Sequence, residues 1–141
     1  MGTEVAALGC TFKYETTPSG TVTLVATAVP PVGKTTSGGK GLYKDKITIA
    51  VVSGTVVLDS TPTATPPASS NTGMVPPGTI TINGTSQKNT TEGDKYVLKG
   101  DEGSETFECT FPSETQPYVT TVMVTIKATV DDPGQNVVKV T

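Results

Sequence analysis

The β-branched residues Thr and Val dominate this chain and limit most strongly what it can fold into. Its 141 residues include 28 Thr and 18 Val, whereas Arg is absent and Leu occurs 5 times. Thr and Val lose side-chain freedom in a helix but pack well on a pleated sheet. The composition therefore predicts an all-β fold, and the length predicts one domain over residues 1–141. The 15 Gly and 11 Pro predict frequent turns and short strands.

Alternating apolar residues indicate where the strands lie. A period of two over residues 22–28, 47–51 and 122–128 predicts three strands, of which the last has the longest signal. The apolar residues of 137–140 predict a closing strand. In each of these segments one face of the strand is expected to be buried.

The segments between these strands differ in composition. Ser60–Pro77 is rich in Thr, Pro and Ser and predicts a long Pro/Thr-rich surface connection. Asn83–Gly84 follows the apolar alternation of Thr79–Ile82 and predicts a tight hairpin turn. Tyr96–Leu98 predicts a short strand within an acidic stretch.

Charge and composition argue against several classes of function. The net charge of −3 and pI near 4.8 leave no basic surface for nucleic acid. Without His or Arg, and without a nucleophile elbow or phosphate loop, an enzyme is not expected. No run reaches the roughly 20 apolar residues that span a bilayer, and no export signal is visible, so no membrane-spanning segment is predicted.

An acidic segment permits two interpretations. Asp101, Glu102 and Glu105 lie close together around a glycine, and clustered carboxylates are the ligands that Ca²⁺ prefers. The same acids also suit a charged sheet edge that keeps neighbouring molecules from pairing with it. Their spacing matches no calcium loop, so no cofactor is predicted.

The two cysteines occupy similar local sequences. Cys10 and Cys109 each begin a Cys-Thr-Phe run, which indicates comparable places in the fold. Two Cys without any His cannot complete the four ligands of a structural zinc site. Both are predicted as small buried hydrophobic residues, with a disulfide or a pair of apposed thiols as the alternative.

Several motifs, scattered over less than half of the chain, follow one another in a familiar order. In this order they resemble the PAAR-like spike-tip proteins, which cap phage tails, type VI secretion systems and extracellular injection particles. Each motif alone is weak, so the order carries the resemblance. The matching segments are Ala7–Phe12, Thr17–Val22, Tyr43–Ile49, Thr79–Gly84 and Asp132–Val137.

The resemblance implies a structural role. It implies a small cone of short strands that caps a trimeric β-helical spike, one copy per trimer, and pierces the target envelope mechanically. The protein would assemble in the cytoplasm and end at the tip of a phage tail-like or secretion particle, with effector cargo as a further partner. Many relatives close the apex with a metal held by His and Cys. Because this chain has no His, packing, backbone pairing or one disulfide would close it here.

Docking on a spike requires an apolar base. The alternating faces near the end of the chain are the predicted part of this base, and ordinary core is the other interpretation of the same residues. The predicted base residues are Val122, Val124, Ile126, Val137, Val138 and Val140.

A different function remains open from the residues alone. An immunoglobulin-like β-sandwich could decorate a capsid or cell surface and bind a receptor or glycan through its loops. Such a domain is expected to bury a large aromatic anchor, but the chain contains no Trp and has only 3 Phe and 4 Tyr.

Overall fold

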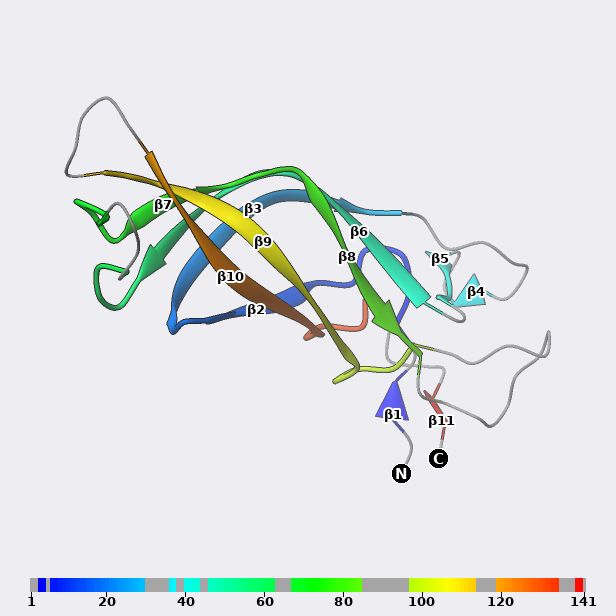
Figure 1. The fold of residues 1–141 in the computed structure, drawn as a ribbon. Helices are drawn as coiled ribbons and strands as arrows, with labels where there is room; N and C mark the ends of the chain where they lie inside the picture. The colour runs from blue at the N-terminus through cyan, green and yellow to red at the C-terminus, as the bar shows by residue number, and fades with distance from the viewer. Residues whose placement is uncertain are drawn as a thin grey trace.

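The computed structural model describes residues 3–4, 6–29, 36–37, 40–43, 46–62, 67–84, 97–113, 119–134 and 139–140. Every regular element in these residues is a β-strand, which confirms the all-β fold (Figure 1). A helix long and apolar enough to cross a membrane is not found in this part of the chain.

Eleven strands follow one another along the described chain. They are β1 (Thr3–Glu4), β2 (Phe12–Thr17), β3 (Gly20–Ala28), β4 (Thr36–Ser37), β5 (Lys40–Gly41), β6 (Lys46–Leu58), β7 (Thr72–Val75), β8 (Gly78–Asn83), β9 (Glu102–Pro112), β10 (Val119–Val130) and β11 (Lys139–Val140).

The main strands are longer than predicted. β3, β6, β9 and β10 have 9, 13, 11 and 12 residues, and the prediction of short strands is wrong for them. The reason is the position of the glycines. Gly54 on β6 and Gly103 on β9 lie inside strands, where they allow close packing instead of forming turns.

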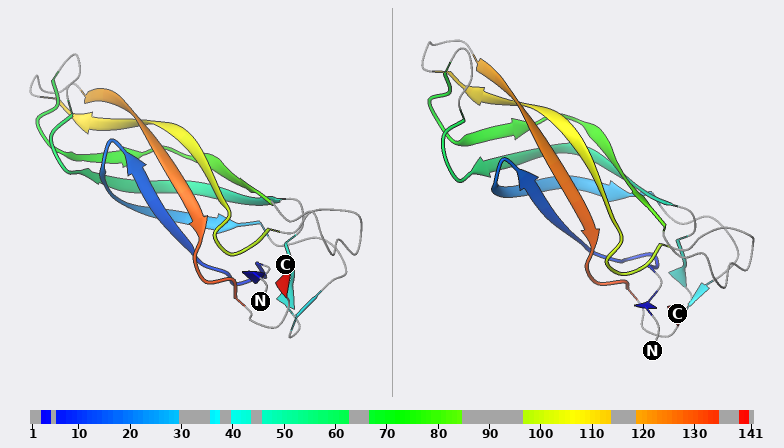
Figure 2. Two further views of the ribbon diagram at one scale, coloured as in Figure 1. Left: turned by 90° about the horizontal axis from the view of Figure 1, so that it is seen from below. Right: turned by 60° about the horizontal axis from the view of Figure 1, so that its bottom comes forward.

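β2, β3 and β6 to β10 form one antiparallel sheet that wraps into a nearly closed barrel (Figure 2), and β4 pairs only with β5. From β3 to β10 the strands pair mostly with their neighbours along the chain, and β10 pairs back with β2. Two seams remain in the described part of the chain: β2 and β3 are in contact but share no ladder, and the same holds for β8 and β9. A single wrapped sheet with neighbouring connections differs from the two-sheet sandwich considered as the alternative fold.

β7 and β8 behave as one strand interrupted by Pro76 and Pro77. Both pair with β6, and the register is the same on the two sides of the interruption. Proline has no N–H to donate, so the ladder is broken without a shift in register. β7 lies inside Ser60–Pro77, where only a connection was predicted. Four residues next to a Pro pair are too short for a recognisable alternation.

The core fills the inside of this barrel. In the long barrel strands, residues on alternate positions point inward, and those on the other positions point to solvent. Buried inward residues are Ile47, Ile49, Val51, Val56, Leu58, Val75, Ile80, Ile82, Phe107, Cys109, Phe111, Val124, Ile126, Ala128 and Val130. Many outward positions are Thr, such as Thr106 and Thr125, whose hydroxyl oxygens lie 2.9 Å apart across β9 and β10.

Three chain segments close one end of the barrel. The Ala6 N–H donates to the Val97 carbonyl (2.7 Å), the Tyr43 N–H to the Ala6 carbonyl (2.8 Å) and the Val97 N–H to the Tyr43 carbonyl (3.2 Å). All three side chains are buried and join the core. This ring of backbone hydrogen bonds seals the end at which both chain termini lie (Figure 1).

The remaining sequence predictions fall near this end. β1 pairs with β11, which confirms part of the predicted closing strand. Of the strand predicted at Tyr96–Leu98, Tyr96 lies outside the described residues, Val97 has no strand assignment and Leu98 forms an isolated bridge. Residues 85–96, which would follow the predicted Asn83–Gly84 hairpin, lie outside the described residues.

Candidate functional site

The outer surface of the barrel divides into an uncharged half and a charged half. β3, β6, β7 and β8 contain a single charged residue, Lys46 at the start of β6. We call the outward residues of β3, β7, β8 and residues 47–58 of β6 the uncharged face. The charged residues of the other half lie on β2, β9 and β10 and are Lys13, Glu15, Glu102, Glu105, Glu108 and Lys127.

Large apolar side chains are exposed on the uncharged face. Val25, Val52 and Met74 are 60%, 61% and 58% exposed, and Val57 is 42% exposed. The register between β3 and β6 shifts after Val25, which leaves Val52 as the extra residue of a β-bulge. The bulge places both valines at the surface, next to each other. Exposed apolar side chains without neighbouring charges are typical of surfaces that contact another protein.

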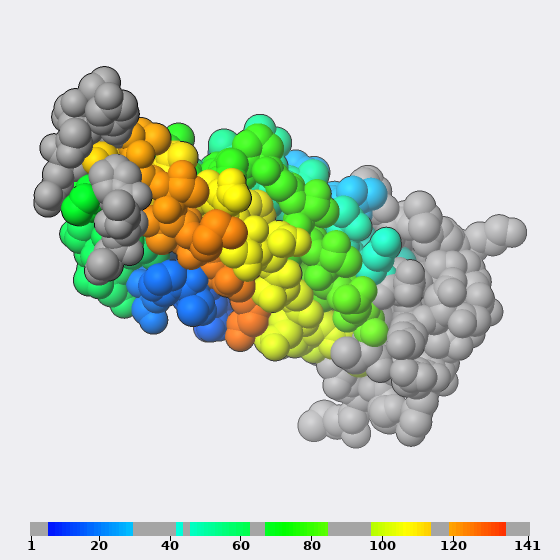
Figure 3. Space-filling view, viewed as in Figure 1, coloured from blue at the N-terminus to red at the C-terminus, as the bar shows by residue number. Residues whose placement is uncertain are grey.

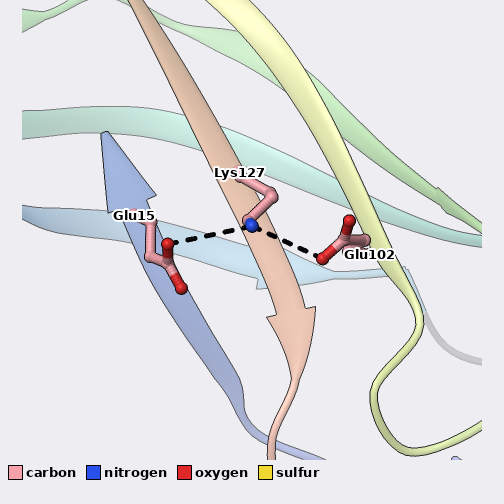
Figure 4. A network of polar contacts seen from close by, with 3 residues as sticks. All are labelled: Glu15, Glu102 and Lys127. Carbon is pink, nitrogen blue, oxygen red and sulfur yellow. Dashed lines mark ion pairs between the residues drawn. The ribbon is translucent and has the colours of Figure 1, made fainter. Parts of the chain in front are cut away.

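On the charged half, one lysine joins three neighbouring strands of the sheet (Figure 4). Lys127 Nζ on β10 lies 3.8 Å from Glu15 Oε2 on β2 and 3.5 Å from Glu102 Oε2 on β9. All three side chains are more than a third exposed, so each pair contributes at most about 1 kcal/mol. The network matches the strand register but does not form a reactive site.

The calcium interpretation of the acidic segment is not supported. Asp101 is buried, its Oδ2 accepts the Leu98 N–H at 2.8 Å, and its carbonyl accepts the Val130 N–H at 2.9 Å. These bonds hold the turn before β9, while Glu102 pairs with Lys127. In the part of the chain that the structure describes, no three Cys, Asp or Glu side chains are arranged to hold a metal ion.

The two cysteines are free thiols and lie far apart. Cys10 precedes Thr11, whose N–H donates to the Asp132 carbonyl, whereas Cys109 lies opposite Val122 on β10. Cys10 lies beyond Phe12, which pairs with Val130, and Val122 and Val130 are separated along β10 by about 26 Å at roughly 3.3 Å per residue. A disulfide requires Cα atoms within about 7 Å. The predicted disulfide or apposed pair is therefore wrong, and both thiols pack as small hydrophobic residues.

Neither thiol is chemically activated. Burial raises the pKa of Cys10 to about 11, and burial likewise raises the pKa of Cys109 to about 11. The carboxylate of Asp132 adds to the rise at Cys10. Thiols with such pKa values stay protonated at neutral pH, so neither is a nucleophile.

We expect iodoacetamide to alkylate both thiols of the folded protein at least about a hundredfold more slowly than those of the unfolded chain at pH 8, because burial of Cys109 also excludes the reagent. The thiolate fraction falls by that factor when the pKa rises from 9.0 to about 11. Because the unfolded chain releases these protons first, the thiol contribution to stability is complete below pH 9 and is lost between pH 9 and 11. Equal alkylation rates in buffer and in denaturant would contradict this placement of the thiols.

The predicted docking base lies mostly in the core. Val124 and Ile126 are fully buried and Val122 packs against them, so the prediction is wrong for these residues. β10 has neighbours on both sides, and its alternating apolar face is the barrel interior. Val137 and Val138 lie outside the described residues. Val140 pairs with Thr3 in β11, and its side chain is not described.

Comparison with protein-family models, with curated proteins and with solved structures gives no match. The candidate site is therefore argued from the geometry of this chain. Sequence reasoning missed the uncharged face, although a signal was present: residues 20–28 and 47–58 contain no charged residue.

Proposed function

We propose that this chain is a structural spike-tip protein that caps a trimeric β-helical spike of a contractile injection machine. One copy would sit on three spike chains and pierce the target envelope mechanically. The order of the five sequence motifs supports this role. The structural observation that supports it best is a wrapped sheet whose strands run along the long axis of the molecule (Figures 1 and 2).

The direction of the strands suits a part that transmits force. Hydrogen bonds between antiparallel strands are perpendicular to the strands. A load along the long axis therefore shears many ladder bonds at once instead of opening them one by one. The wrapped sheet leaves few open edges, and the ring of Ala6, Tyr43 and Val97 closes one end.

The uncharged face is the described surface that best suits contact with the spike. Burying Val25, Val52 and Met74 removes apolar area from water without desolvating a charge. A contact on the charged half would instead bury Glu and Lys side chains, which costs free energy unless each finds a partner.

Native mass spectrometry of the chain co-expressed with a trimeric spike protein tests the proposal. We expect one copy per three spike chains. The double variant Val52→Lys with Met74→Lys should weaken capping at least tenfold. Met123→Lys is the matched control, because Met123 is 55% exposed on β10 beside the charged residues and should cap normally.

Two results would overturn the proposal. A chain that leaves the spike uncapped, or that binds in three copies per trimer, excludes a single capping tip. If a chain that does not cap the spike binds a glycan saturably on an array, this result would favour the surface-binding module instead.

A further inference from the structure

The barrel wall is interrupted between the β7–β8 junction and β9. A single residue pair, Met74 with Thr110, joins β7 to β9, and β8 shares no ladder with β9 in the described chain. Farther along, Gly103 brings β9 directly against the backbone of Thr81 in β8. Between these two contacts the strands separate, because Pro76 and Pro77 have no N–H to offer.

This separation forms a slot of about 490 Å³. β8 and β9, whose residues form its two walls, lie side by side at the surface that Figure 3 presents. One wall consists of residues 76–79 and the other of residues 105–108. At the base, the Phe107 ring covers Gly78, and Phe107 is 4% exposed. The volume falls in the range of sites that hold small ligands or short peptide groups.

The slot combines this apolar base with two carboxylates. Glu105 and Glu108 are exposed, and neither forms an ion pair within the described residues. Glu105 Oε1 accepts the Thr106 N–H at 3.0 Å, which leaves Oε2 for a ligand. Lys127, on the neighbouring strand, is already held by Glu15 and Glu102. Two carboxylates without a third ligand do not form a metal site, but they complement an ammonium or guanidinium group.

We propose that this slot binds an extended segment of a partner protein through one Lys or Arg side chain. Its alkyl stem packs on Phe107 and Pro77, and Glu105 and Glu108 take its charge. The net charge of −3 attracts a basic segment before contact. This proposal does not rest on the spike-tip role, since it follows from the slot alone.

The test is an NMR titration of the ¹⁵N-labelled full chain with the peptide Ac-Thr-Val-Lys-Val-Thr-NH₂. We expect saturable shifts at the amides of Gly78, Thr79 and Thr106–Glu108. The Glu105→Gln/Glu108→Gln variant should bind at least tenfold more weakly, and both side chains are exposed, so it should fold normally. Glu102→Gln is the matched control on the same strand, outside the slot, and should bind as the unmodified chain does.

Other outcomes of the titration overturn the proposal. Equal shifts with the peptide that carries Glu in place of Lys would exclude recognition of a cation. Shifts centred on Glu102 and Lys127 would exclude the slot. Saturable shifts at Glu105 and Glu108 with CaCl₂, in the absence of any response to the Lys peptide, would replace the proposal with a metal site.

Discussion

Replacing Gly103 with valine is expected to lower the free energy of unfolding by about 3 kcal/mol. Gly103 lies on β9, and a Cβ atom there would overlap the carbonyl of Thr81 on β8. The obstacle is backbone, so no side-chain rotation relieves it. The substitution should force β8 away from β9 along a seam that has no ladder to hold it. Urea unfolding followed by circular dichroism measures the loss.

The neighbouring residue provides the control for this prediction. Ser104 lies on the same strand and is exposed, so Ser104→Val should change stability by less than about 0.5 kcal/mol. If Gly103→Val lowers the free energy of unfolding no more than Ser104→Val does, then β8 and β9 are not in contact at this point.

The second large effect is expected at the contact between Gly73 and Phe111. A Cβ added at Gly73 would lie 2.6 Å from two atoms of the Phe111 ring, and that ring is fully buried. Gly73→Ala should therefore cost about 2 kcal/mol through overpacking. Phe111→Leu alone should cost about 1.5 kcal/mol because it leaves a small cavity.

Combining the two substitutions separates overpacking from other causes. The leucine makes room for the new methyl group. The double variant should therefore lose at least about 1 kcal/mol less unfolding free energy than the two single variants lose together. Strictly additive losses would mean that the ring does not cover Gly73. Urea unfolding of the unmodified chain, the two single variants and the double variant gives the four free energies of unfolding that this double-mutant cycle compares.

The alternating strands could be predicted from the sequence, whereas the irregular features could not. Residues 22–28, 47–51 and 122–128 alternate clearly, and all three segments lie in strands. β9 was missed because its outward positions include Glu102 and Glu108, so an acidic composition concealed a regular alternation of Phe107, Cys109 and Phe111.

The sites were harder to predict than the strands. An apolar face such as that of Val124 and Ile126 has the same pattern whether it packs inside a barrel or docks on a partner. Pairing of β10 with β2 makes this face interior, and that pairing joins residues more than 100 positions apart. The similar sequences around Cys10 and Cys109 also give no information on the distance between the two thiols. That distance follows only from the register of β2 and β9 on β10.

The slot depends on a long-range coincidence as well. Pro76 and Pro77 predict a break in a strand, but the sequence does not show that Glu105 and Glu108 lie across that break. The uncharged face was easier to predict, since the absence of charged residues over 20–28 is visible directly in the sequence.

Pairing of β2 with β10, which brings β2 against β3 and so closes the barrel, is the claim on which the core, the faces and the proposals depend. Amide hydrogen exchange of Phe12–Thr17, followed by NMR, tests it most directly. Alternate amides of β2 should be protected like those of β10, because they bond to β10, while those facing the β2–β3 seam exchange faster. Fast exchange of every amide in β2, alongside protected amides in β9 and β10, would contradict closure.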